Sequence, residues 1–131
     1  MKGYRKMPTF IRILVGKTSL RAELFDTPCA KQIIAKLPIE AIPNEWGDEF
    51  YFEIPVIAQL DDTETTKVAI GDIGYWPPGK ALAIFFGPTP MSKGTDPVPA
   101  SAVNLVGKIL DDAAILKQEK GAARIILDKE T

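Results

Sequence analysis

The chain has 131 residues, 46% of them hydrophobic, and a formal net charge of -1. This length allows one ordinary hydrophobic core, so we expect a single domain over residues 1–131. The balanced charge offers no positive field for a phosphate backbone, which excludes nucleic acid as an expected partner. Histidine is absent and Cys29 is the single cysteine, which excludes an intrachain disulfide, zinc sites and histidine-based catalysis.

The N-terminal residues are basic and then apolar, as in a secretory signal. Arg12 interrupts the apolar stretch, and no cleavage site of small residues follows, so this segment is interpreted as a first strand. No segment approaches the ~20 apolar residues of a membrane span. With a lone cysteine favouring a reducing compartment, we expect a soluble, cytoplasmic protein that has no membrane partner.

The first third of the chain predicts a hairpin followed by a helix. Residues 9–15 and 18–25 are rich in apolar and β-branched side chains and flank the tight connection Gly16–Lys17. A capping side chain and a first-turn proline at 26–28 then predict a helix of about ten residues that ends near Pro38. We expect this helix to cover an open end or face of a sheet.

Short strands dominate the rest of the chain. A second short helix is predicted from a cap at Asp111 to Gly121, and residues 87–99 are predicted to form a long surface loop. Few helices and many short strands favour an antiparallel barrel or sandwich. The expected strands are 39–42, 50–54, 67–70, 82–86, 104–110 and 123–127.

The segment from Gly71 to Pro90 contains a turn between aromatic residues. Pro77 places Trp76 in extended conformation, and Pro78–Gly79 fits the central positions of a type II turn. Rigid aromatic side chains beside this turn could form the wall of a cleft. The alternative is that Trp76, Phe85 and Phe86 are core residues, whereas Tyr75 and Trp46 lie beside turns and carry polar atoms that need partners.

Acidic side chains gather upstream of this turn. Glu49, Tyr51 and Glu53 share one face of a strand, opposite its aromatic and aliphatic side chains. A carboxylate pair there could serve as acid and base, or the acidic residues could simply be solvated. The spacing of Asp61–Asp62 suits no metal, and residues 71–74 lack the third glycine of a phosphate-binding motif, so no metal and no cofactor are predicted.

Three strings carry a family resemblance: residues 44–55, NEWGDEFYFEIP; residues 71–90, with YWPPG and IFFGPTP; and residues 99–109, PASAVNLVGKI. Over Leu37 to Ile109 the chain resembles uncharacterised prokaryotic proteins of the cyclophilin-like family. The resemblance implies a mainly β fold, a closed antiparallel barrel of about eight strands with two short capping helices. It also implies a surface pocket where true cyclophilins bind a prolyl peptide.

The resemblance also bears on activity. Overlay of residues 39–43 on the corresponding cyclophilin strand places Glu40 where the catalytic arginine lies in true cyclophilins, and an ionised carboxylate cannot donate a hydrogen bond. We therefore expect a module that binds a small molecule or a proline-containing peptide, with prolyl isomerase as the alternative and no catalytic residue assigned. A structural role as a monomer or homodimer is the third possibility. The candidate ligand-binding residues are Glu40, Trp46, Glu49, Tyr51, Tyr75, Trp76 and Phe86.

Overall fold

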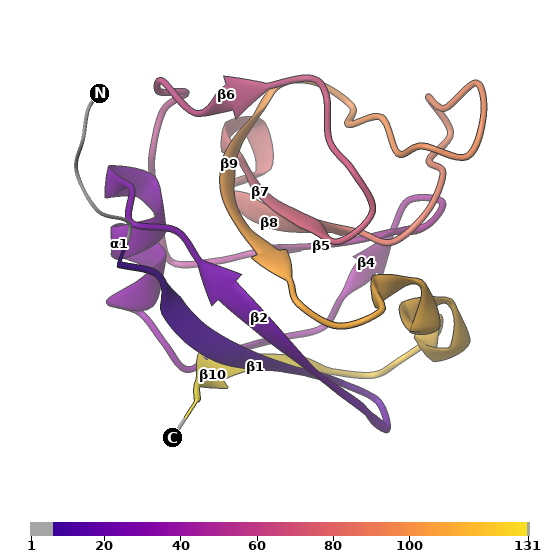
Figure 1. The fold of residues 1–131 in the computed structure, drawn as a ribbon, viewed down its shortest axis with the longest axis horizontal. Coiled ribbons are helices and arrows are strands. Elements are labelled where there is room, and N and C mark those ends of the chain that lie inside the picture. Colours follow the sequence, from indigo (N-terminus) through magenta and orange to yellow (C-terminus); the bar gives the residue numbers. More distant parts are fainter. Residues whose placement is uncertain (1–6, 131) are drawn as a thin grey trace.

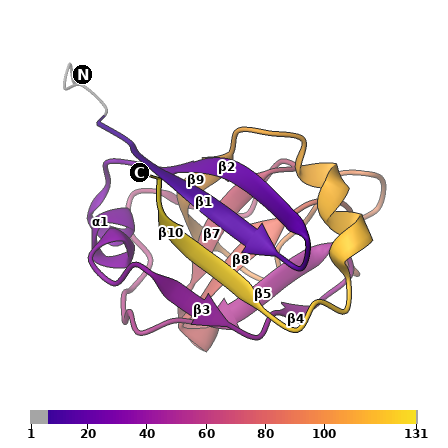
Figure 2. The ribbon, with the colours of Figure 1, turned by 90° about the horizontal axis from the view of Figure 1, so that it is seen from below.

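The computed structural model describes residues 7–130. Residues 1–6 and residue 131, which the single-domain prediction includes, lie outside the described part. Antiparallel strands make up most of the regular secondary structure, and the helical segments Pro28–Ile34 and Ala113–Glu119 lie at opposite ends of the molecule (Figures 1 and 2). The elements are β1 Thr9–Val15, β2 Thr18–Leu24, α1 Pro28–Ile34, β3 Ile39–Ala41, β4 Asn44–Glu45, β5 Glu49–Glu53, β6 Glu64–Thr65, β7 Asp72–Trp76, the 3-10 helix η1 Pro77–Gly79, β8 Ala81–Phe85, β9 Val103–Ile109, the 3-10 helix η2 Ala113–Glu119 and β10 Ile125–Lys129.

The strands form one ten-stranded antiparallel sheet in the order β3-β10-β1-β2-β9-β7-β8-β5-β4, with β6 paired to β9. The mainly β prediction is confirmed, but the closed barrel of about eight strands is wrong. Between residues 7 and 130, β3 and β4 lie at the two ends of this order and do not pair with each other, so the sheet is an open half-barrel. The two strands have three and two residues and are joined through Ile42–Pro43, where proline has no N–H to donate. The gap between β3 and β4 is therefore bridged by the chain and not by strand hydrogen bonds. We call this gap the open seam.

The predicted hairpin and first helix are confirmed. Val15 pairs with Thr18, and Gly16 adopts a φ of 57°, which glycine tolerates in the tight connection. The Thr27 side chain caps α1 by accepting a hydrogen bond from the Ala30 N–H at 3.3 Å. The α-helical part ends at Ile34 rather than near Pro38, because the Lys36 and Leu37 N–H groups bond carbonyls three residues back, at Ile33 and Ile34.

Two other sequence-based predictions are wrong in position. Residues 67–70 form no strand, because the Asp72 carboxylate accepts from the Ala69 N–H at 2.8 Å and closes a turn. The strand begins after this turn, as β7. The second helix is a 3-10 helix, and its cap is Asp112, which accepts from the Ala114 N–H at 3.1 Å. Asp111 instead accepts from the Arg21 N–H.

Strand β8 is buried on both faces. Its inner side chains, such as Leu82 and Ile84, belong to the hydrophobic core inside the half-barrel. Its outer side chains, such as Ala83 and Phe85, do not belong to that core, yet they are also buried. Residues 87–102 fold back beside this outer face, so a second, smaller layer forms there. The candidate site lies in this outer layer.

No helix within residues 7–130 is long and apolar enough to cross a lipid bilayer.

Candidate functional site

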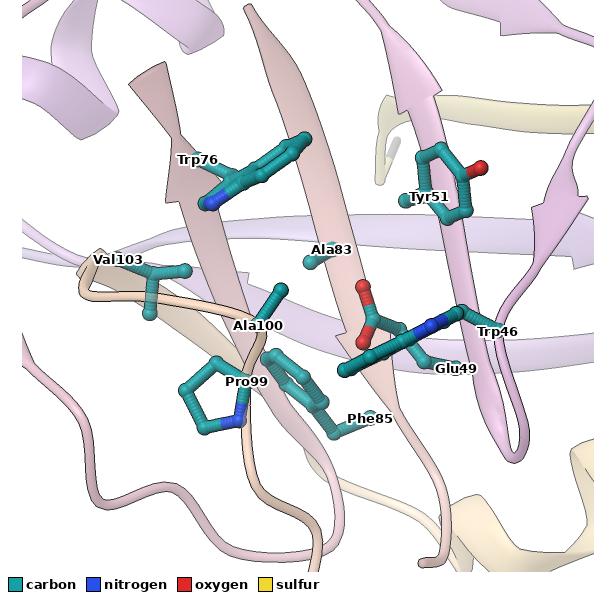
Figure 3. A pocket seen from close by; sticks show the side chains of 9 residues that line it. All are labelled: Trp46, Glu49, Tyr51, Trp76, Ala83, Phe85, Pro99, Ala100 and Val103. Atoms are coloured by element: carbon teal, nitrogen blue, oxygen red, sulfur yellow. The ribbon is translucent and has the colours of Figure 1, made fainter. Parts of the chain in front are cut away.

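A pocket of about 160 Å³ opens on the outer face of β5, β8 and β7 (Figure 3). The floor of the pocket consists of outward-pointing side chains of these strands, because every second residue of a strand points away from the core. The segment before β9 supplies the remaining wall. The lining residues are Trp46, Glu49, Tyr51, Trp76, Ala83, Phe85, Pro99, Ala100 and Val103.

Trp76 forms one wall and is held on two sides. Its backbone is extended (φ -106°, ψ 102°), as Pro77 requires, and its indole Nε1–H donates to the Ser101 Oγ at 2.7 Å. Its ring lies against Gly79, where an added Cβ would be 2.8 Å from the ring carbon Cε3. Glycine is therefore needed for space. The predicted type II turn is wrong, because Gly79 is not in a positive-φ conformation and Lys80 takes the left-handed one at φ 48°.

Trp46 forms the facing wall from the connection between β4 and β5. Its N–H donates to the Glu49 carbonyl at 3.0 Å, and Gly47 has a φ of 61° in this tight turn. The Asp48 N–H donates to the Pro88 carbonyl at 2.9 Å, which ties the turn to the returning loop. The Asp48 carboxylate lies 2.6 Å from the Lys120 Nζ, so a second contact ties the turn to the segment after η2.

Glu49 lies between these walls, and its carboxyl group points into the pocket (Figure 3). The residue is 7% exposed, and its Oε1 is the only fully buried side-chain N or O atom within residues 7–130 that has no hydrogen-bond partner. Burial raises the pKa of Glu49 to about 8, because the charged form loses its hydration. At neutral pH the group is therefore mostly a neutral acid, which can both donate and accept a hydrogen bond.

Three of the predicted residues lie outside this pocket. Tyr75 faces the core, where its hydroxyl donates to the Val56 carbonyl at 2.6 Å and accepts from the Ala58 N–H at 3.2 Å. Phe86 is also in the core, with its ring centroid 4.7 Å from that of Phe50. Glu40 lies on β3 at the other end of the sheet order, exposed and paired with Arg124.

The structure thus brings together Trp46, Glu49, Tyr51 and Trp76 out of the predicted set. Five other lining residues were not among the predicted binding residues: Ala83, Phe85, Pro99, Ala100 and Val103. The two-residue period of a strand places Phe85 on the face opposite Ile84 and Phe86, but it does not say which of these faces encloses the core. The proline-rich segment had no comparable local signal.

The catalytic chemistry of the pocket is limited by its lining. None of the arginines within residues 7–130 lines it, so no guanidinium is available to donate to a substrate carbonyl. Nor do three His, Cys, Asp or Glu side chains of this part of the chain gather into a possible metal site. Glu49 is the one carboxyl group among the lining residues, and Tyr51 the one phenol.

Comparison with known proteins now decides the family. The family model described as Cyclophilin-like matches residues 9–128. The chain belongs to the cyclophilin-like family. This cyclophilin-like chain is also similar to the solution structure of a hypothetical protein from Archaeoglobus fulgidus, with 32% identity and a TM-score of 0.78 over 98% of this chain and 100% of that one. No curated protein matches the cyclophilin-like chain.

Proposed function

We propose that this protein is a binding module whose outer-face pocket takes a small molecule or one side chain of an extended peptide. The observation that carries the proposal is the unpartnered Oε1 of Glu49 between Trp46 and Trp76. A buried polar atom without a partner costs about 1–3 kcal/mol. A ligand that supplies the missing hydrogen bond would recover part of that free energy on binding.

The size of the pocket supports a compact ligand group. A cavity near 150 Å³ accepts a molecule about as large as benzene, and this pocket measures about 160 Å³. Aromatic and aliphatic side chains would bury the body of the ligand, and Glu49 would orient it. A single ring, a short branched chain or a proline side chain is compatible with this volume.

The chain provides its own reporter for a test. It has two tryptophans, and both line the pocket, so tryptophan fluorescence reports on this site alone. We expect titration with small ring compounds and proline-containing peptides to change the emission, and NMR amide shifts to map to Trp46, Glu49 and Trp76. Matched titrations of Trp76→Phe and Glu49→Gln should show weaker binding. A full fragment and peptide set that leaves both signals unchanged would remove the proposal.

Prolyl isomerisation is the second candidate, and the state of Glu49 favours it. A neutral carboxyl group can donate a hydrogen bond to the imide, which an ionised one cannot do, and the pKa of Glu49 is raised to about 8. Acceleration of cis–trans conversion in a proline tetrapeptide should then be present at pH 6 and lost as pH rises above 8. A rate at pH 6 equal to the uncatalysed rate excludes this candidate.

The location and the assembly of the protein stay predictions. We infer a cytoplasmic module that acts as a monomer or homodimer. Light scattering over a range of concentrations tests the assembly, and localisation of a tagged chain in cells tests the compartment.

A further inference from the structure

Within residues 7–130, no Lys or Arg side chain lines the pocket beside Glu49. Its neighbours from β7, β8 and the segment before β9 are Trp76, Phe85 and nonpolar side chains, none of which is titratable. From its own strand Tyr51 also lines the pocket. Asp48 is adjacent in sequence, but its carboxylate forms ion pairs with the Nζ of Lys120 at 2.6 Å and the Nζ of Lys117 at 3.8 Å. Among residues 7–130 the pocket lining thus holds no positive group to balance a negative charge on Glu49, and a cation that enters the pocket would do so.

The two tryptophan walls turn their ring faces toward a cation that enters the pocket (Figure 3). The indole N–H of Trp76 already donates to Ser101, so this ring offers its face more than its donor. Trp46 stands across the pocket, on the other side of the Glu49 carboxyl group (Figure 3). The negative face of an indole attracts cations, most strongly where water is excluded. Both the indole rings and the Glu49 carboxyl group therefore favour a positively charged ligand.

We propose that the ligand of this pocket is a small organic ammonium ion, with at least one N–H for Glu49 and an apolar body of about one ring for Trp46 and Trp76. This inference deepens the proposed binding function and rests on it. A neutral hydrogen-bond donor would satisfy Oε1 but would leave the carboxyl group protonated and the ring faces without a cation. A carboxylate ligand would face Glu49 without any positive residue in the lining.

An ammonium ligand should also release a proton from Glu49 when it binds, and this release can be measured. When the ammonium ion binds, the Glu49 carboxylic acid loses its proton to solvent and the N–H bonds to the resulting carboxylate. Because the free group has its pKa raised to about 8, binding at pH 7 should release close to one proton. Affinity should rise with pH until about 8 and then level off, since an alkylamine stays protonated to roughly pH 10.

The test uses three ligands of one shape and different charge. Cyclohexylmethylamine, cyclohexylmethanol and cyclohexanecarboxylate are titrated into the full chain at pH 7, with tryptophan emission as the signal. We expect the amine to bind at least about tenfold more tightly than the alcohol, and the carboxylate most weakly. Calorimetry in buffers of different ionisation enthalpy measures the released proton.

Two glutamine variants provide the matched control. Glu49→Gln keeps the size and polarity of the side chain, so it should lower amine affinity to that of the alcohol and abolish proton release. Glu53→Gln, on the same face of β5 but outside the pocket, should change neither. Circular dichroism at each pH confirms that both variants are folded before their affinities are compared.

The outcomes separate this inference from the function on which it rests. Equal affinity for amine and alcohol, or an amine affinity that Glu49→Gln leaves unchanged, overturns the ammonium ligand while the pocket still binds. No emission change and no NMR shift with any of the three compounds overturns the ammonium ligand as well. If the wider fragment and peptide set also gives no response, the binding module fails with it.

Discussion

The inner face of β7, β8 and β5 is buried and the outer face is partly buried, and the buried polar atoms of the two faces differ in their hydrogen bonding. On the inner face the Tyr75 hydroxyl makes two hydrogen bonds to the backbone at Val56 and Ala58. On the outer face the Glu49 carboxyl group has an oxygen with no partner. A buried polar group that is satisfied within the protein stabilises the fold. One that is left unsatisfied beside a cavity is available to a ligand, and for this reason we assign structure to the inner face and function to the outer one.

The largest expected effect is on the inner face. Phe50→Ala removes a fully buried ring that packs on Phe86. Loss of that packing should lower the free energy of unfolding by about 3–5 kcal/mol, measured by urea denaturation. Trp76→Phe, at the half-buried edge of the pocket, should cost much less but weaken ligand binding. Equal destabilisation by the two substitutions would contradict the assignment of the faces.

A smaller loss is expected when one hydroxyl is removed from the inner face. Tyr75→Phe leaves the Val56 carbonyl and the Ala58 N–H without their partner. The free energy of unfolding should fall by about 1–3 kcal/mol, with ligand affinity unchanged. The same denaturation experiment measures the first quantity and tryptophan emission the second. A loss of affinity without a loss of stability would place Tyr75 in the binding site after all.

The buried carboxyl group of Glu49 should make the free energy of unfolding depend on pH. Burial raises the pKa of Glu49 to about 8 in the folded protein, whereas an exposed glutamate titrates near 4.3. The folded state therefore holds a proton that the unfolded state releases. This contribution to stability is fully present below pH 4 and is lost as pH rises to about 8.

Within that window the slope should be at most about 1.4 kcal/mol per pH unit. Glu49→Gln should remove this slope from urea denaturation measured between pH 5 and 8, and Glu53→Gln should leave it in place. Identical pH profiles for the wild type and Glu49→Gln would show that the carboxyl group is hydrated.

The smallest effect is expected at Glu40, far from the pocket in the order of the sheet. Its carboxylate pairs with Arg124 on an exposed surface, and such pairs contribute about 0–1 kcal/mol. Glu40→Gln should therefore leave both stability and ligand affinity nearly unchanged. A clear loss of affinity would mean that Glu40 acts in the site predicted from the family overlay.

Local patterns in the chain were enough to predict the β-hairpin, the helix that follows a capping side chain at residues 26–28, the alternation in β5 and the extended Trp76 before the diproline. Each of these depends on a few neighbouring residues, through turn geometry, capping or the two-residue period of a strand. The same period separates Phe85 from Phe86 and Trp76 from Tyr75, although it does not say which member of each pair faces the core.

Tertiary structure decided that last question, together with the open seam between β3 and β4 and the position of Glu40 outside the pocket. Curvature of the sheet determines which face encloses the core, and the return of residues 87–102 determines how much of the other face is buried. Both depend on contacts between segments far apart in sequence. The raised pKa of Glu49 has the same origin, because desolvation arises only when distant segments meet around the side chain.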